Sequence, residues 1–272
     1  MIAAAVVVAA AVLAVVFRPR DLNQVAFDQF WAPVVSDKSP ILVAIAHPIV
    51  YHPSARATRK DSEQSPPGSL PTQHVLRLPA KEIDGSDMIP VVDQYVGVGD
   101  LVACSELTAF FARQQKTSRL RLASKVEFAD LKDAPTILIG AYTNRWTIQL
   151  SPTFRYRFGF TPDGRASVQD ATDPKRQWAL PNTGEDGSSQ EDYIVITRLA
   201  NSNSGKPIVI VAGLKQFGTE AGGRLLANPE HLGDLLRKLP ADWPGRNLQL
   251  LLHARVIGNS PTPPNLVASH LW

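Results

Sequence analysis

Residues 207–214 (PIVIVAGL) and the residues that follow them, 215–223 (KQFGTEAGG), decide the fold. The continuous run of β-branched residues predicts a buried strand. The Gly-Thr-Glu sequence after it predicts that a helix begins there. Residues 136–141 (TILIGA) repeat this transition, because residues 142–146 (YTNRW) can also start a helix. Two strand-to-helix junctions of this kind predict an α/β protein.

The rest of the chain predicts a mixed sheet. Residues 193–199 and 207–214 are β-branched runs joined by NSNSG, which predicts a hairpin. Helices are predicted over 101–115, with Asp100 as N-cap, and from Asn228-Pro229 onward. Residues 52–73 read as a long polar loop and residues 161–190 as irregular surface. We predict one α/β domain over residues 30–272, divided into two lobes. Further strands are predicted at 41–45, 119–123, 154–160, 248–257 and 266–271.

The first seventeen residues contain no charged or polar side chain, and Arg18-Pro19-Arg20 follows at once. As a helix they would reach about 25 Å, close to the thickness of a bilayer core. We predict a single-pass anchor over residues 1–17, a linker over 18–29 and an extracytoplasmic domain. Arg18 and Arg20 favour the opposite orientation, with the domain in the cytoplasm. Two arginines have only a weak influence when the domain that follows them is large. A cleaved signal peptide and a chain that lacks a preceding domain are the alternatives.

Composition limits the partners. The net charge is +3, and the local basic cluster around Arg119 and Arg121 alternates with leucines, as on the wet face of a strand. We therefore expect no nucleic-acid partner. The single cysteine, Cys104, excludes an intrachain disulfide, and its apolar neighbours predict a buried structural thiol.

The two strand-to-helix junctions are the candidate site. Ligands of open α/β sheets bind beyond the carboxyl ends of the strands, where helix N-termini present free N–H groups. We expect both junctions to line one polar cleft that holds a small ligand, and free N–H groups would suit an anionic one. The predicted ligand-binding residues are Thr143, Asn144, Arg145, Gly218 and Thr219, with Ser105 as a further donor.

The sequence offers no pattern for catalysis, a cofactor or a metal. It contains neither G-x-G-x-x-G nor a P-loop, and no G-x-S-x-G surrounds any serine. His47 and His52 each precede a proline and have no cysteine or carboxylate cluster beside them, so we expect no metal. We predict a binding or sensory domain rather than an enzyme. The alternatives are a hydrolase or transferase acting at the same cleft, and an interaction subunit of a membrane complex with a protein partner.

Several segments resemble a group of uncharacterised bacterial proteins. They are ILIGAYTNRWTIQL, DYIVITRL with IVIVAGLKQFGTEAGG, the NPEHL helix start, and the end NLQLLLHARVIG…PPNLVASHLW. In that group a similar domain follows a membrane helix, sometimes behind a DNA-binding or other signalling domain. The resemblance covers residues 30–272 and implies a membrane-anchored domain. A looser similarity to periplasmic substrate-binding proteins implies a two-lobed ligand-binding fold.

Overall fold

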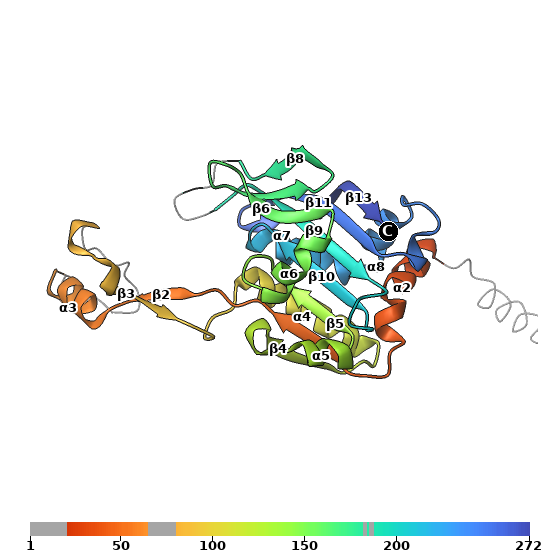
Figure 1. Cartoon of the computed structure of the whole chain (residues 1–272), viewed down its shortest axis with the longest axis horizontal. Coiled ribbons are helices and arrows are strands. Elements are labelled where there is room, and N and C mark those ends of the chain that lie inside the picture. The colour runs from red at the N-terminus through yellow and green to blue at the C-terminus, as the bar shows by residue number, and fades with distance from the viewer. Residues whose placement is uncertain (1–20, 65–79, 182–183, 185–187) are drawn as a thin grey trace, which may run out of the picture.

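A computed structural model describes residues 21–64, 80–181, 184 and 188–272. It confirms the α/β class: a mixed, curled sheet carries helices on both faces (Figure 1). The predicted anchor over residues 1–17 lies outside the described residues. Within the described ranges, none of the helices combines the length and the apolar character that crossing a bilayer requires.

The main sheet has the order β4-β1-β5-β10-β9-β11, and both β12 and β13 pair with β11. The first four strands are parallel, whereas β9 runs antiparallel to both of its neighbours. The predicted hairpin is confirmed, with Ile208 opposite Leu199 across β9 and β10. The strands are β1 Ile41–Ile45, β4 Ser118–Leu122, β5 Thr136–Ile139, β9 Glu191–Leu199, β10 Ile208–Gly213, β11 Leu248–Ile257, β12 Ser260–Pro261 and β13 Asn265–Leu271.

Both faces of the parallel part are covered, so every residue of β1, β5 and β10 is buried and almost all of them are apolar. Side chains alternate between the faces, so Val43 joins one core cluster and Leu42 the other. The first face is covered by α2 Leu22–Val35, α4 Val98–Arg113, α7 Gln216–Leu226 and α8 Pro229–Leu236. The second face is covered by the short helices α5 Phe128–Asp133 and α6 Arg145–Leu150 and by the small sheet β6-β7-β8.

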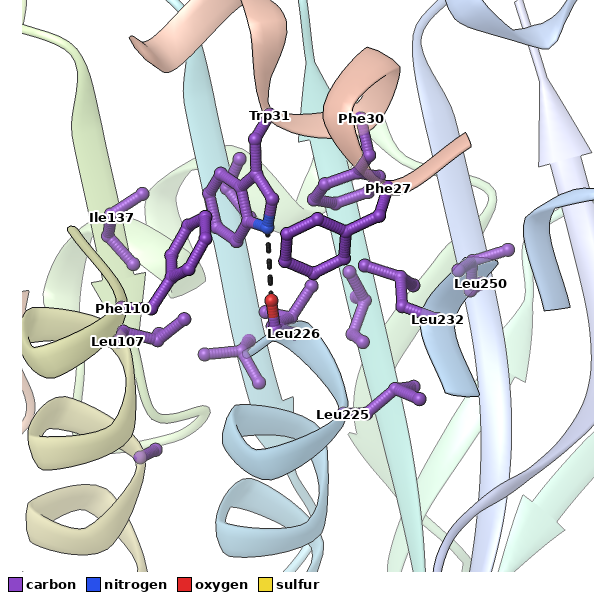
Figure 2. Close-up of a cluster of buried hydrophobic side chains, with 14 of the residues drawn as sticks. Phe27, Phe30, Trp31, Leu107, Phe110, Ile137, Leu225, Leu226, Leu232 and Leu250 are labelled. Carbon is purple, nitrogen blue, oxygen red and sulfur yellow. Dashed lines mark hydrogen bonds between the residues drawn. The ribbon is translucent and has the colours of Figure 1, made fainter. Parts of the chain in front are cut away.

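Trp31 of α2 lies at the centre of the larger core (Figure 2). Its ring meets Phe111 edge to face at 5.1 Å between centroids, and its Nε1 donates a 3.0 Å hydrogen bond to the carbonyl of Leu226. This bond satisfies the indole N–H in an otherwise apolar environment. Trp31 therefore joins the helices α2, α4 and α7 at one point.

Helix α2 begins within the segment that we predicted as a linker, residues 18–29. Its Pro33 has no N–H, so the carbonyl of Gln29 lacks the usual donor from the next turn. The buried Arg198 of β9 supplies donors instead, to the carbonyls of Gln29 (3.4 Å) and Phe30 (2.9 Å). The sequence pattern of α2 gave no signal of this contact, because Arg198 lies far away in the chain.

Helices α4 and α7 pack backbone to backbone. A Cβ atom at Gly99 would lie 1.9 Å from the carbonyl oxygen of Gln216, and one at Gly223 would lie 2.4 Å from the Cβ of Ala103. Both positions therefore require glycine. The contact brings the first turns of the two helices together at the carboxyl edge of the sheet.

Residues 161–190 were predicted as irregular, and this prediction was wrong in part. They contain β7 Ala166–Asp170 and β8 Asp173–Ala179, which pair with β6 Tyr156–Phe160. The buried Gln249 of β11 joins this small sheet to the main one, since its side chain accepts from the amide of Tyr156 (2.9 Å) and donates to the Tyr156 carbonyl (3.1 Å).

An arm projects from the body beyond the end of β1 (Figure 1). It is a ribbon of β2 Val50–Pro53 and β3 Met88–Val91 that carries α3 Ala55–Gln64. The predicted loop over 52–73 is therefore helical in part, and its residues 65–73 lie outside the described ranges. The buried Asp87 connects the segments of the arm. It accepts a 2.6 Å hydrogen bond from Ser54 and forms an ion pair with Arg56.

Candidate functional site

The parallel strands β1, β5 and β10 end at one edge of the sheet, and a cavity of about 190 Å³ opens there. The first turn of α4 and the first turn of α7 form its sides. This is the position at which ligands bind in open α/β sheets. The lining residues are Pro48, Gly97, Asp100, Ala141, Tyr142, Thr143, Gly213, Leu214, Lys215, Gln216 and Thr219.

Asp100 is the charged group buried deepest in this cavity, with only 8 % of its surface exposed. We predicted it as the N-cap of the helix, but α4 begins three residues earlier and its N-cap is Gly97. Glycines make room for the carboxylate, because a Cβ at Gly97 or Gly140 would lie 3.1 or 3.4 Å from its oxygens. Burial raises the pKa of Asp100 to about 6, although a hydrogen bond with Thr219 acts to lower it.

The side chain of Thr219 lies next to this carboxylate. Its Oγ1 accepts a 3.0 Å hydrogen bond from the amide of Gly213 at the end of β10, which leaves the hydroxyl hydrogen for Asp100. The Gly-Thr-Glu sequence predicted a helix start at this residue, but α7 starts at Gln216 and Thr219 lies inside it. The residue thus links β10, α7 and the Asp100 of α4.

A second carboxylate, Asp192 of β9, lies directly beneath the start of α7. It is fully buried and accepts hydrogen bonds from the amides of Gly218 (2.6 Å) and Lys215 (3.1 Å). Burial raises the pKa of Asp192 to about 7, although these amides favour the ionised form. Asp192 therefore occupies the position at which we expected an anionic ligand.

The predicted site residues have different roles in the structure. Thr143 is exposed and lines the cavity together with Thr219. Gly218 leaves space for Asp192, since a Cβ there would lie 2.7 Å from the carboxyl carbon. Ser105 is exposed on α4 and does not line the cavity. The structure thus brings the two predicted junctions together, with Thr143 and Thr219 at the cavity.

Asn144 is buried and serves the fold. Its Oδ1 caps α6 by accepting from the amides of Trp146 and Thr147, and its Nδ2 donates to the carbonyls of Ala44 and Ile139. These bonds use all of its hydrogen-bonding capacity toward the protein. The neighbouring Arg145 does not line the cavity. Its guanidinium stacks on Trp146 and donates to the Val126 carbonyl.

The rim of the cavity is aromatic and polar. Tyr142 stacks on the exposed Phe160 with centroids 4.9 Å apart, and its hydroxyl donates to the carbonyl of Gly159 at 2.8 Å. Lys215 and Gln216 lie on the other side and also line a wider groove of about 610 Å³. A ligand in the cavity could therefore extend along this groove.

His47 lies just past β1, beside the cavity residue Pro48. Its Nε2 lies 3.0 Å from a carboxylate oxygen of Asp93, which also pairs with Lys125 at 2.7 Å. His52 lies on the arm, where it contacts Tyr95. In the described ranges, no three histidine, cysteine or carboxylate side chains are arranged to hold a metal ion.

The sequence analysis missed the two carboxylates of the site. Asp100 has a recognisable signal, an acidic residue that follows Gly97 and Gly99 at the start of an apolar helix, but this pattern also suits an N-cap. Asp192 has none, since it precedes the strand predicted at 193–199 and meets α7 only in the folded chain. The buried Cys104 is confirmed, and burial raises its pKa.

Comparison with known proteins adds no family assignment. The chain matches no model of a known protein family, and no match was found among curated proteins or solved structures.

Proposed function

We propose that this chain is a small-molecule-binding domain whose ligand occupies the cavity between the first turns of α4 and α7. The observation that carries the proposal is the carboxylate of Asp100, which is 8 % exposed, opens onto this cavity and makes no ion pair with a described residue. A buried carboxylate with so few partners is costly. A ligand that donates hydrogen bonds to Asp100 would remove this cost.

The geometry favours a ligand with donor groups over a simple anion. The amide of Gly218 donates to Asp192, and the amides of Trp146 and Thr147 donate to Asn144. These three amides, which belong to the helix starts expected to receive an anion, are therefore used within the protein. Asp100 would in addition repel a negative group in the cavity.

Thermal unfolding of the full chain with a panel of small metabolites tests this proposal. The panel contains sugars, polyols, amines, amino acids and carboxylic acids. A ligand at 100 times its Kd stabilises the folded state by about 2.7 kcal/mol. We expect at least one class to stabilise the wild-type protein and to lose its effect in Asp100→Asn. The control is Asp234→Asn on the surface of α8, which should respond like wild type. If no class stabilises the protein, or if Asp100→Asn responds like the control, the proposal fails.

The membrane anchor over residues 1–17, the extracytoplasmic location and the sensory role are part of the proposal. Their support is the apolar N-terminal sequence. The two-lobed, periplasmic-binding-protein-like arrangement is also proposed. Its support is that β6-β7-β8 forms a separate layer, whose Phe160 stacks on the rim residue Tyr142. Detection of the intact N-terminus in the membrane fraction would test the anchor.

An enzyme acting at the same cleft is the first alternative. Its best candidate pair would be the hydroxyl of Thr219 with the carboxylate of Asp100. Thr219 is buried, however, and its oxygen already accepts the amide of Gly213. A nucleophile needs a free and accessible oxygen, so this pair favours binding over catalysis.

An interaction subunit is the second alternative, and the arm supports it. Apolar side chains are exposed on both strands of the ribbon and on the residues that follow β3, including Tyr51 (54 %) and Ile89 (46 %). A two-stranded ribbon is only marginally stable when it stands alone in water. Exposed apolar surface marks interaction sites when it is extensive, and here it lies on both faces of the ribbon, since Tyr51 pairs with Pro90 and Ile89 with His52. The exposed residues are Ile49, Tyr51, Met88, Ile89, Val92 and Val96.

A further inference from the structure

The cavity between α4 and α7 holds two groups of opposite charge. Asp100 lies on the α4 side and Lys215 on the α7 side. Among the described residues, neither side chain forms an ion pair with a protein partner. We infer that the ligand is a small zwitterion, an α-amino acid whose ammonium binds Asp100 and whose carboxylate binds Lys215. This inference rests on the proposed function and names the ligand class of the same site.

The ammonium group fits the environment of Asp100. Among the described residues, the hydroxyl of Thr219 is the one donor to its carboxylate, so acceptor positions remain for the three donors of an ammonium. The raised pKa of Asp100 reflects burial without a cation, and a bound ammonium would favour the ionised form again. A neutral hydroxyl would bind there too, but it would leave the charge of Asp100 uncompensated.

The carboxylate group fits the opposite side. Lys215 is half-buried at the N-cap position of α7, and no acceptor among the described residues receives the first-turn amides of Gln216 and Phe217. A lysine ammonium and free amides at the start of a helix attract a carboxylate. Asp192 already accepts the other amides of this turn, so Lys215 supplies the charge that the ligand needs.

The size and walls of the cavity select a small amino acid. Its volume of about 190 Å³ lies below the 300–1,000 Å³ typical of pockets for drug-sized ligands. Pro48, Ala141 and Leu214 form an apolar wall that suits a short aliphatic side chain. Longer side chains would have to extend into the wider groove past Gln216.

Calorimetric titration of the full chain with L-alanine and its two half-ligands tests the inference. Ethylamine lacks the carboxylate of L-alanine, and propionate lacks its ammonium. We expect L-alanine or another small amino acid to bind, and each half-ligand to bind at least about tenfold more weakly, the loss expected for one charge-assisted hydrogen bond. This series needs no variant, so it holds even where a variant fails to fold.

Two variants test which residue binds the ammonium of the ligand and which binds its carboxylate. Asp100→Asn should weaken the amino acid more than propionate, and Lys215→Met should weaken it more than ethylamine. Lys238→Met, an exposed change just after the end of α8, is the matched control. If small amino acids bind no better than their half-ligands, or if a sugar or a dicarboxylate binds instead through Asp100, the zwitterion inference is overturned while the proposed function stands. If no compound binds in an Asp100-dependent way, both fail.

Discussion

The amide of Gly218 donates a 2.6 Å hydrogen bond to the carboxylate of Asp192, a residue that precedes it by 26 positions. The bond connects the start of β9 to the first turn of α7, whose own N-cap residue, Lys215, makes no side-chain capping bond. A carboxylate at this position complements the positive end of the helix. The protein thus carries its own anion where the sequence suggested a ligand.

Asp192→Ala should therefore destabilise the fold. It leaves the buried amides of Gly218 and Lys215 without an acceptor, so we expect the free energy of unfolding to fall by about 2–4 kcal/mol. Asp192→Asn retains one acceptor oxygen and should cost less. Urea denaturation of the three proteins measures both effects. Equal stability of Asp192→Ala and wild type would contradict the capping role.

Asp100 should make stability fall as pH rises. Its pKa is raised from 3.8 to about 6 in the folded state, so the folded protein holds this proton more tightly than the unfolded chain. The contribution is greatest at low pH, and it is lost between about pH 4 and pH 6. We expect Asp100→Asn to gain up to about 3 kcal/mol relative to wild type over this interval. Denaturation of both proteins at pH 4 and pH 7.5 checks this, because other carboxylates contribute equally to the two proteins. A constant difference would refute it.

The contact between Arg198 and α2 should depend on Pro33. Lysine cannot reproduce the fork of donors toward the carbonyls of Gln29 and Phe30, so Arg198→Lys should lower stability by about 2–3 kcal/mol. Pro33→Ala restores an amide for Gln29. The cost of Arg198→Lys should then be smaller in the Pro33→Ala background. A double-mutant cycle in urea measures this coupling, and additive effects would rule it out.

Substitutions of the neighbouring residues Asn144 and Thr143 should have very different effects on the stability of the fold. Asn144→Ala removes the cap of α6 and the bonds to Ala44 and Ile139, so we expect a loss of about 2–4 kcal/mol. Thr143→Ala changes an exposed residue of the cavity and should leave the unfolding midpoint within about 0.5 kcal/mol of wild type. Thermal and urea unfolding compare the two. A larger loss of stability in Thr143→Ala than in Asn144→Ala would contradict the structural role of Asn144.

The arm should promote association if it serves as an interaction surface. Tyr51→Ser with Ile89→Ser reduces its apolar exposure, and Ile257→Ser changes an equally exposed residue elsewhere. In sedimentation equilibrium we expect wild type and Ile257→Ser to exceed the monomer mass with rising concentration, and the arm variant to remain monomeric. Identical masses for all three proteins would argue against self-association through the arm.

Much of the sheet could be predicted from the sequence, because strands buried on both faces are continuous apolar runs. Residues 136–139 and 208–213 are such strands, and the cap Asn228 starts α8 as expected. The polar strand β8 escaped prediction. β8 is exposed over most of its length, so its residues carry no apolar period. The start of α2 was missed because residues 18–29 read as a linker, and the helix continues through Pro33 because a distant arginine donates to the carbonyls of Gln29 and Phe30.

The site was predictable only as a region. Strand-to-helix junctions reveal that residues near 143 and 219 meet at one edge of the sheet, since parallel strands place their ends together. They do not reveal which donors are already used. The partners of Asn144 and Gly218 lie up to 100 residues away in the chain, and only the folded structure identifies them.

The glycine contact between α4 and α7 determines how the cavity can respond to a ligand. Asp100 and Lys215 stand on two helices whose backbones touch at Gly99 and Gly223, so neither helix can slide or rotate without a steric clash. The separation of the two helix starts that carry these residues is therefore fixed before any ligand arrives. Such a site keeps a rigid backbone frame, and it leaves adjustment to the side chain of Lys215 and to the aromatic rim. A methyl group at position 99 would push the helices apart and widen this frame.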